Sequence, residues 1–122
     1  IELGQIQGGF LQGAGWLTME EVKWKPNGQI TTYSPSTYKI PAVNDMPESF
    51  NVEIFKDGKN YEKVINKSKT TGEPPLMNAM SVFFAIKDAI SSVGNYDITP
   101  IINAPATPEK ILMSIKNLKV KL

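Results

Sequence analysis

The sequence contains no cysteine and no histidine among its 122 residues. These absences exclude a disulfide, a zinc site built from Cys and His, an iron–sulfur cluster ligated by Cys, and a Ser-His-Asp triad. If the chain takes part in redox or hydrolytic chemistry, it contributes only carboxylates, lysines, tyrosines, amides and backbone groups. A metal centre would then have to be held by a cofactor or by other chains.

A charge excess and a long apolar run are also missing. The 13 Lys and Arg residues nearly balance the 12 Asp and Glu residues, so nothing in the net charge of +1 favours nucleic acid or an anionic membrane. No apolar run reaches the roughly 18–20 residues that span a bilayer. The apolar fraction of 41% is typical of a globular protein, and we expect a single domain over residues 1–122. Because the chain opens without an initiator Met or a signal peptide, we interpret it as the interior of a longer protein.

Glycine and glutamine share one face of the first predicted helix, over residues 5–22. This face carries, at positions i, i+3, i+4 and i+7, Gln5, Gly8, Gly9 and Gln12. Glycine costs about 1 kcal/mol relative to alanine inside a helix, so these glycines need a reason. One reading is tight packing against a neighbouring backbone, which the pattern alone favours. The other is the approach of a ligand along this Gln/Gly face.

Past the middle of the chain, a carboxylate stands between a glycine and two prolines, in Gly72-Glu73-Pro74-Pro75. Proline suits the first turn of a helix, where its missing N–H has no intrahelical partner. We therefore expect a helix to begin near Glu73. The preceding glycine lets the backbone come close to whatever the carboxylate faces. This is the geometry of a positioned acid or base, and equally that of an ordinary helix start.

The remaining pattern predicts an α+β fold. Between Leu76 and Ile86 only two residues are polar, which predicts a buried helix over 76–90. Thr107 as N-cap and Pro108 at the first helical position predict a short C-terminal helix. We therefore expect two main helices and a short C-terminal helix, packed with a small mixed or antiparallel sheet. Short apolar or alternating runs predict its strands within residues 29–33, 50–55, 61–68 and 98–102.

Six blocks of sequence then carry a family resemblance. They are residues 4–13 (Gly-Gln-Ile-Gln-Gly-Gly-Phe-Leu-Gln-Gly), 18–21 (Thr-Met-Glu-Glu), 35–41 (Pro-Ser-Thr-Tyr-Lys-Ile-Pro), 68–76 (Ser-Lys, then Gly-Glu-Pro-Pro-Leu), 81–90 (Ser-Val-Phe-Phe-Ala-Ile-Lys-Asp-Ala-Ile) and 104–110 (Ala-Pro-Ala-Thr-Pro-Glu-Lys). In this order and at matching separations, they resemble the C-terminal end of the molybdenum-cofactor domain of the xanthine dehydrogenase/xanthine oxidase family. Any one block would be unspecific, but six together are specific, and they extend over about residues 1–115.

The resemblance implies roles for individual residues. Glu73, in the Gly-Glu-Pro-Pro motif, is implied to be the general base that takes a proton from the molybdenum-bound hydroxyl. Gly72 is implied to lie close to the molybdenum ligands. Gln5, in the Gly-Gln-x-x-Gly motif, is implied to hydrogen-bond the cofactor. Thr70 and Thr71 are placed in the same cofactor-binding segment, where family members often carry Ala-Val.

The resemblance also implies a reaction and its partners. The full protein would oxidise hypoxanthine and xanthine to urate at a molybdenum–molybdopterin cofactor. Electrons would leave through 2Fe-2S clusters and FAD, on other domains or subunits, to NAD or O₂. The protein would be cytoplasmic, with no nucleic-acid or membrane partner. Pro74-Pro75 favours the xanthine type, because aldehyde oxidases usually have small residues there. An aldehyde oxidase-type hydroxylase and a non-catalytic interaction or scaffold module are the alternatives.

By the same resemblance, the chain is a fragment of a larger molybdenum-binding domain. The residues that orient the substrate and most cofactor contacts would lie outside it. We therefore expect the isolated chain to bind no cofactor and to be inactive. We also expect it to self-associate through apolar surface such as that of the helix over 76–90.

Overall fold

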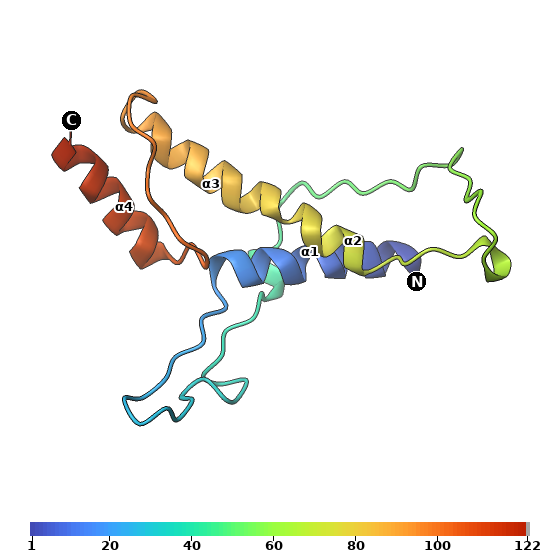
Figure 1. Ribbon diagram of the computed structural model, residues 1–122, viewed down its shortest axis with the longest axis horizontal. Coiled ribbons are helices and arrows are strands. Elements are labelled where there is room, and N and C mark those ends of the chain that lie inside the picture. Colours follow the sequence, from blue (N-terminus) through green and yellow to red (C-terminus); the bar gives the residue numbers. More distant parts are fainter. Residues whose placement is uncertain (122) are drawn as a thin grey trace.

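The computed structural model describes residues 1–121 as helices joined by long irregular segments (Figure 1). Among these residues are four α-helices and two short 3₁₀ turns. They are α1 (Glu2–Thr18), η1 (Val43–Asp45), η2 (Ile65–Lys67), α2 (Glu73–Asn78), α3 (Met80–Ser92) and α4 (Pro108–Lys121). Within the same residues, no helix is both long and apolar enough to cross a membrane.

Helix α1 is the centre of the arrangement (Figure 1). It packs against α2 and α3, which follow each other along it, and α3 also contacts α4. Two segments extend away from α1 as arms, residues 19–42 and residues 46–72, and η1 lies between them against α1 (Figure 1). The molecule is therefore branched, with its helices in the middle and its irregular segments outside.

The predicted α+β fold with a small sheet is wrong. Within residues 1–121 there is no strand, and the only β-type pairing is an isolated antiparallel bridge between Trp24 and Ile30. The segment over 50–55 has the predicted alternation, but no backbone hydrogen bond joins it to another segment of the described chain. Alternating hydrophobicity indicates an extended segment with one covered face, and it does not supply the neighbouring strand that a sheet requires.

The helix predicted over 76–90 is present but divided and less buried than expected. It begins at Glu73, as the Gly-Glu-Pro-Pro pattern predicts, and it changes direction at Ala79, where α2 ends and α3 begins. Ala79 and Ile90 are buried, yet Phe84 is 59% exposed. A helix that is apolar on all sides predicts cover on all sides, but within the described residues α2 and α3 are covered only where they meet α1 and where α3 meets α4.

The C-terminal helix α4 starts as predicted. The backbone N–H of Lys110 donates to Thr107 Oγ1 at 3.4 Å, so Thr107 caps the helix. Two contacts join this region to the end of α1: the N–H of Ala106 donates to the carbonyl oxygen of Leu17 at 2.6 Å, and Lys110 pairs with Glu21 at 3.4 Å. The chain therefore returns to the C-terminal end of α1 after α3.

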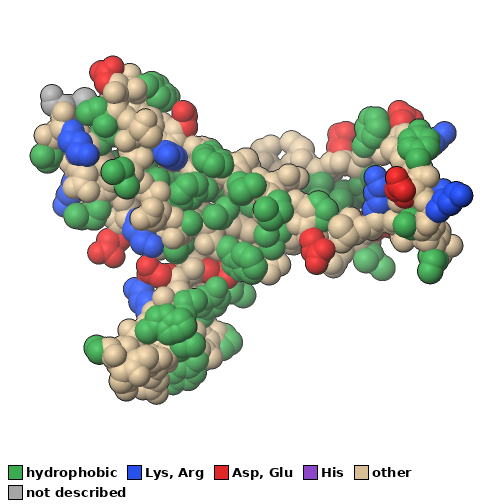
Figure 2. Space-filling view, in the orientation of Figure 1, with side chains coloured by type: hydrophobic (Ala, Val, Ile, Leu, Met, Phe, Trp, Pro, Cys, Tyr) green, Lys and Arg blue, Asp and Glu red, His purple; other side chains and the backbone are tan. Residues whose placement is uncertain are grey.

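The exposed surface is large for a chain of this size. The accessible area is 9,471 Å², whereas a folded monomer of 13.5 kDa exposes about 6,500 Å². Hydrophobic side chains gather over the helical centre and along the arms (Figure 2). The apolar residues that are buried form only a small core: Ala79, Ile90, Ala106 and Leu118.

Candidate functional site

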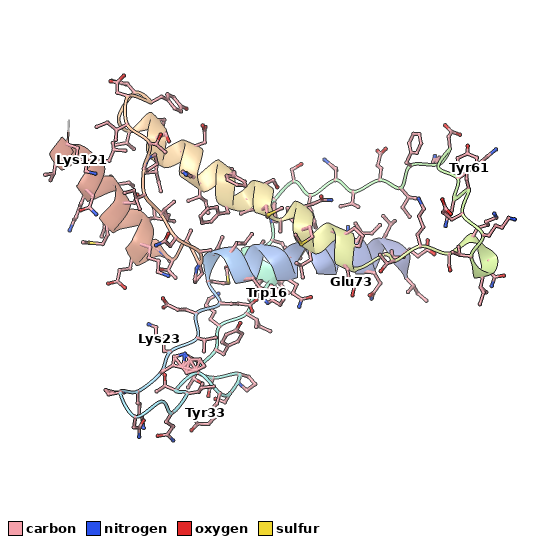
Figure 3. The ribbon with its side chains drawn as sticks, in the orientation of Figure 1. Trp16, Lys23, Tyr33, Tyr61, Glu73 and Lys121 are labelled. Carbon is pink, nitrogen blue, oxygen red and sulfur yellow. The ribbon has the colours of Figure 1, made fainter. Side chains whose placement is uncertain are left out.

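Glu73 is the first residue of α2 and lies beside α1 (Figure 3). Its carboxylate is exposed, and its Oε2 accepts a hydrogen bond of 3.2 Å from the hydroxyl of Thr70. Pro74 and Pro75 occupy the first turn of the helix, where proline removes no intrahelical hydrogen bond. The local sequence thus fixes a carboxylate at the point where the chain turns into α2.

Two glycines of α1 allow α2 to approach closely. A Cβ atom at Gly9 would overlap the carbonyl oxygen of Gly72, and a Cβ atom at Gly13 would come within 2.7 Å of the Ala79 Cβ. Both obstacles belong to α2 or to the residues at its ends, which leave little room for adjustment. For Gly9, the reading as tight packing is therefore confirmed, and Gly13 packs against α2 in the same way.

Other glycines of α1 face open space instead. A Cβ atom at Gly4 or Gly8 would meet no described atom within 4 Å. Both glycines line a groove of about 520 Å³ between α1 and the start of α2, which we call the Glu73 groove. Its lining residues are Gly4, Gln5, Gly8, Gly9, Gln12, Thr70, Gly72, Glu73 and Leu76. The predicted Gln/Gly face therefore borders this groove along its length, and the approach of a ligand there stays a prediction.

Four of the five predicted site residues come together in the Glu73 groove. A Cβ atom at Gly72 would lie 3.5 Å from Gln5 Oε1, in ordinary van der Waals contact, so Gly72 and the Gln5 amide are direct neighbours. Thr71 is the exception, because it lines a separate cavity of about 610 Å³ with Lys69 and Pro74. The structure thus places Gln5, Thr70, Gly72 and Glu73 on one groove and Thr71 outside it.

A second groove, of about 400 Å³, lies further along α1, and sequence reasoning did not identify it. Glu20 lines it and is only 9% exposed. The hydroxyl of Tyr38 donates to Glu20 Oε2 at 2.6 Å, and this hydrogen bond raises the pKa of Tyr38 above its usual value. Both residues fall inside blocks that carry the family resemblance, but no periodicity or spacing links them, since they are 18 residues apart.

A family comparison connects this chain to molybdopterin-binding proteins, and individual relatives connect it to xanthine dehydrogenases. The family described as "Molybdopterin cofactor-binding domain" matches residues 1–47. The chain is 46% identical to a xanthine dehydrogenase of Oryza sativa subsp. japonica, over 93% of this chain and 9% of that protein. It is 49% identical to a xanthine dehydrogenase/oxidase of Felis catus, over 91% of this chain and 9% of that protein. The chain therefore spans about a tenth of the length of these relatives.

A solved structure has the same arrangement. The crystal structure of quinoline 2-oxidoreductase from Pseudomonas putida 86 matches with a TM-score of 0.75 and 30% sequence identity. The match covers 93% of this chain and 14% of that one. The branched arrangement of helices and arms thus recurs as a small part of a much larger protein.

Proposed function

This chain belongs to the xanthine dehydrogenase family, as part of its molybdopterin cofactor-binding domain, and on that premise we propose that it supplies the general base Glu73 and one wall of the cofactor site in a molybdenum hydroxylase. The proposed reaction of the full-length protein is the oxidation of hypoxanthine and xanthine to urate. The observation that carries the proposal is the Glu73 groove, in which Gln5, Thr70, Gly72 and Glu73 meet.

The lining of the Glu73 groove fits a bulky cofactor with polar edges. Gly4 and Gly8 present no side chain, so the groove stays open along α1. The amides of Gln5 and Gln12 line the same groove and can both donate and accept hydrogen bonds. When bound, molybdenum–molybdopterin would supply the redox centre for transfer of oxygen to carbon. This chain would hold the cofactor through Gln5, with the hydroxyl of Thr70 as a further polar contact.

The geometry around Glu73 suits a base. Thr70 holds Oε2 through its hydroxyl, while no hydrogen bond within residues 1–121 uses Oε1. A base must lie within hydrogen-bond reach of the proton it removes, and the open groove gives Oε1 that access. Glu73 would therefore accept the proton that the reaction releases.

The substrate class is part of the proposal. Pro74 and Pro75 follow Glu73, the arrangement that favours a purine substrate over an aldehyde. Rates with xanthine and with an aromatic aldehyde, measured on the full-length protein, separate these two classes. Faster turnover of the aldehyde than of xanthine would favour the aldehyde oxidase-type hydroxylase. Turnover of neither substrate would favour a non-catalytic module.

The remaining partners follow from the same proposal. The chain would form the C-terminal part of its domain, with residues 1–122 as one unit. The rest of that domain would cover the excess of about 3,000 Å² of surface. 2Fe-2S clusters and FAD, on other domains or subunits, would carry electrons to NAD or O₂, and the full protein would work in the cytoplasm.

Removal of the Gln5 amide tests the cofactor contact. Gln5→Ala in the full-length protein is expected to weaken cofactor retention about fivefold, because a hydrogen bond contributes about 1 kcal/mol net. The measurement is molybdenum per protein by mass spectrometry after extensive dialysis. Gln7→Ala is the matched control, since Gln7 lies on the same helix but does not line the groove. Equal molybdenum content in the two variants would contradict the role of Gln5.

The isolated chain is expected to self-associate. Met77, Met80 and Phe84 lie at helical spacing on α2 and α3, and all three are exposed. Without the rest of the domain, burial between copies would remove this apolar surface from water. Light scattering coupled to size exclusion is expected to show oligomers, which decrease when Met80 and Phe84 are both replaced by Ser. A monodisperse monomer of the unmodified chain would contradict this expectation.

A further inference from the structure

The residue that follows the C-terminal cap of α1 folds back onto the helix. The backbone N–H groups of Met19 and Glu20 both donate to the carbonyl oxygen of Gly15, each at 2.9 Å. The Glu20 carboxylate then occupies the space beside Gly15, where a Cβ atom would overlap Glu20 Oε1 and the ring of Pro41. Glycine at position 15 therefore admits both the carboxylate and the end of the first arm.

The first arm, residues 19–42, is held by a hydrogen bond where it returns to α1. Tyr38 donates its hydroxyl to Glu20 at 2.6 Å. The following turn is stiffened by Asp45, whose Oδ2 accepts from the N–H of Ala42 at 2.8 Å and pairs with Lys39 at 3.0 Å. These two interactions lower the pKa of Asp45, so the carboxylate keeps its charge, and the turn its ion pair, to a lower pH than an ordinary aspartate would. The turn that the Glu20–Tyr38 hydrogen bond holds against α1 is therefore itself well defined.

Glu20 and Pro41 contact α1 at Gly15, on the side of the helix opposite to α2. Successive helix residues turn by about 100°, so Gly15 lies about 200° around the axis from Gly13. Gly13 and Gly9 touch α2 and the residues beside it, and Gly15 touches Glu20 and Pro41. A helix that is held on two opposite sides cannot roll about its own axis.

Rotation of α1 matters for the Glu73 groove. Gly8 and Gln12 line both this groove and the second groove, whose wall includes the turn that follows Tyr38. Gln5 lies two turns before Gln12, on the same side of the helix. A roll of α1 would therefore sweep Gln5 and Gln12 together away from Glu73.

We propose that the Glu20–Tyr38 hydrogen bond is a positioning device that fixes the rotation of α1 and thereby directs Gln5 and Gln12 into the groove opposite Glu73. This inference rests on the proposed function of that groove. Glu20 and Tyr38 are positioning residues, since neither lines the Glu73 groove.

The test uses three variants of the full-length protein. Tyr38→Phe removes the donor and leaves a buried carboxylate unpaired. Glu20→Gln keeps an acceptor for Tyr38. Glu20→Met combined with Tyr38→Phe replaces both polar groups by apolar ones of similar shape, which is close to neutral for stability. Tyr33→Phe is the control on the same arm, because Tyr33 is 79% exposed.

Turnover and stability are expected to separate. Tyr38→Phe should lower kcat per bound molybdenum about tenfold and speed hydrogen exchange in α1, since small misplacements of a site are costly in rate. Glu20→Gln should retain most of the kcat and most of the protection of α1 from hydrogen exchange. The double variant should regain the melting temperature of the unmodified protein but keep the low kcat and the fast exchange. Full turnover in Tyr38→Phe, or turnover that recovers with stability in the double variant, would overturn the proposal.

Glu73→Gln, measured in the same assay, separates this inference from the proposed function. If Glu73→Gln is inactive and Tyr38→Phe is fully active, only the positioning role fails. If Glu73→Gln remains active, the assignment of the base fails, and the positioning role fails with it.

Discussion

Replacing Glu73 with Gln in the full-length protein is expected to lower xanthine oxidation by a factor of about 10²–10⁴, the usual contribution of general base catalysis. The amide has the shape of the carboxylate and can still accept the hydrogen bond from Thr70, which is 3.2 Å long in the unmodified chain. It cannot accept a proton near neutral pH. The measurement is kcat per bound molybdenum, with molybdenum content expected to stay unchanged.

The control for this variant is Glu53→Gln. Glu53 is exposed in the second arm and lines none of the grooves described above. It undergoes the same chemical change, so a general effect of losing one negative charge would appear in both variants. Turnover of the Glu73 variant within twofold of the control would contradict the role of Glu73 as the base.

The second large effect is expected from Gly9→Ala. The added methyl group would overlap the backbone carbonyl oxygen of Gly72, so α1 and the start of α2 would have to separate. Overpacking of this kind costs about 1–3 kcal/mol of stability. The shift would also move Glu73 relative to the Gln/Gly face of α1. We therefore expect a lower melting temperature together with lower turnover.

Gly8→Ala is the matched control for the packing argument. Its methyl group meets no described atom within 4 Å, and alanine favours a helix over glycine by about 1 kcal/mol. The apoprotein is therefore expected to keep or gain stability, but molybdenum content should fall because the methyl group enters the groove. Equal loss of stability in the Gly8 and Gly9 variants would contradict the assignment of the two glycines to different neighbours.

The local features of the site could be predicted from the sequence. The face that carries Gln5, Gly8, Gly9 and Gln12 follows from helical spacing alone, and the start of α2 at Glu73 follows from proline in the first turn. Which glycine packs and which stays open could not be predicted. That distinction depends on where α2 lies, and spacing within one helix does not contain this information.

The wrong predictions about strands and burial have one physical source. A local sequence pattern shows that a segment has an apolar face, but it does not show which other segment packs against that face. The alternation over 50–55 indicates a covered face, but within residues 1–121 no neighbouring strand pairs with this segment. The apolar run after Glu73 predicts burial, yet Phe84 is exposed in the described chain. The Glu20–Tyr38 hydrogen bond was missed for the same reason, because it joins residues on opposite ends of an irregular arm.

The role of Glu73 is tested most directly by a single reductive turnover. The full-length protein and its Glu73→Gln variant are mixed with saturating xanthine in the absence of NAD and O₂, and reduction is followed by absorbance. Because later electron transfer cannot limit this step, the rate reports the chemistry in which the base acts. We expect the variant to be reduced at least about 10²-fold more slowly while it still binds xanthine. Reduction of the variant at the rate of the unmodified protein would contradict the assignment of Glu73 as the general base.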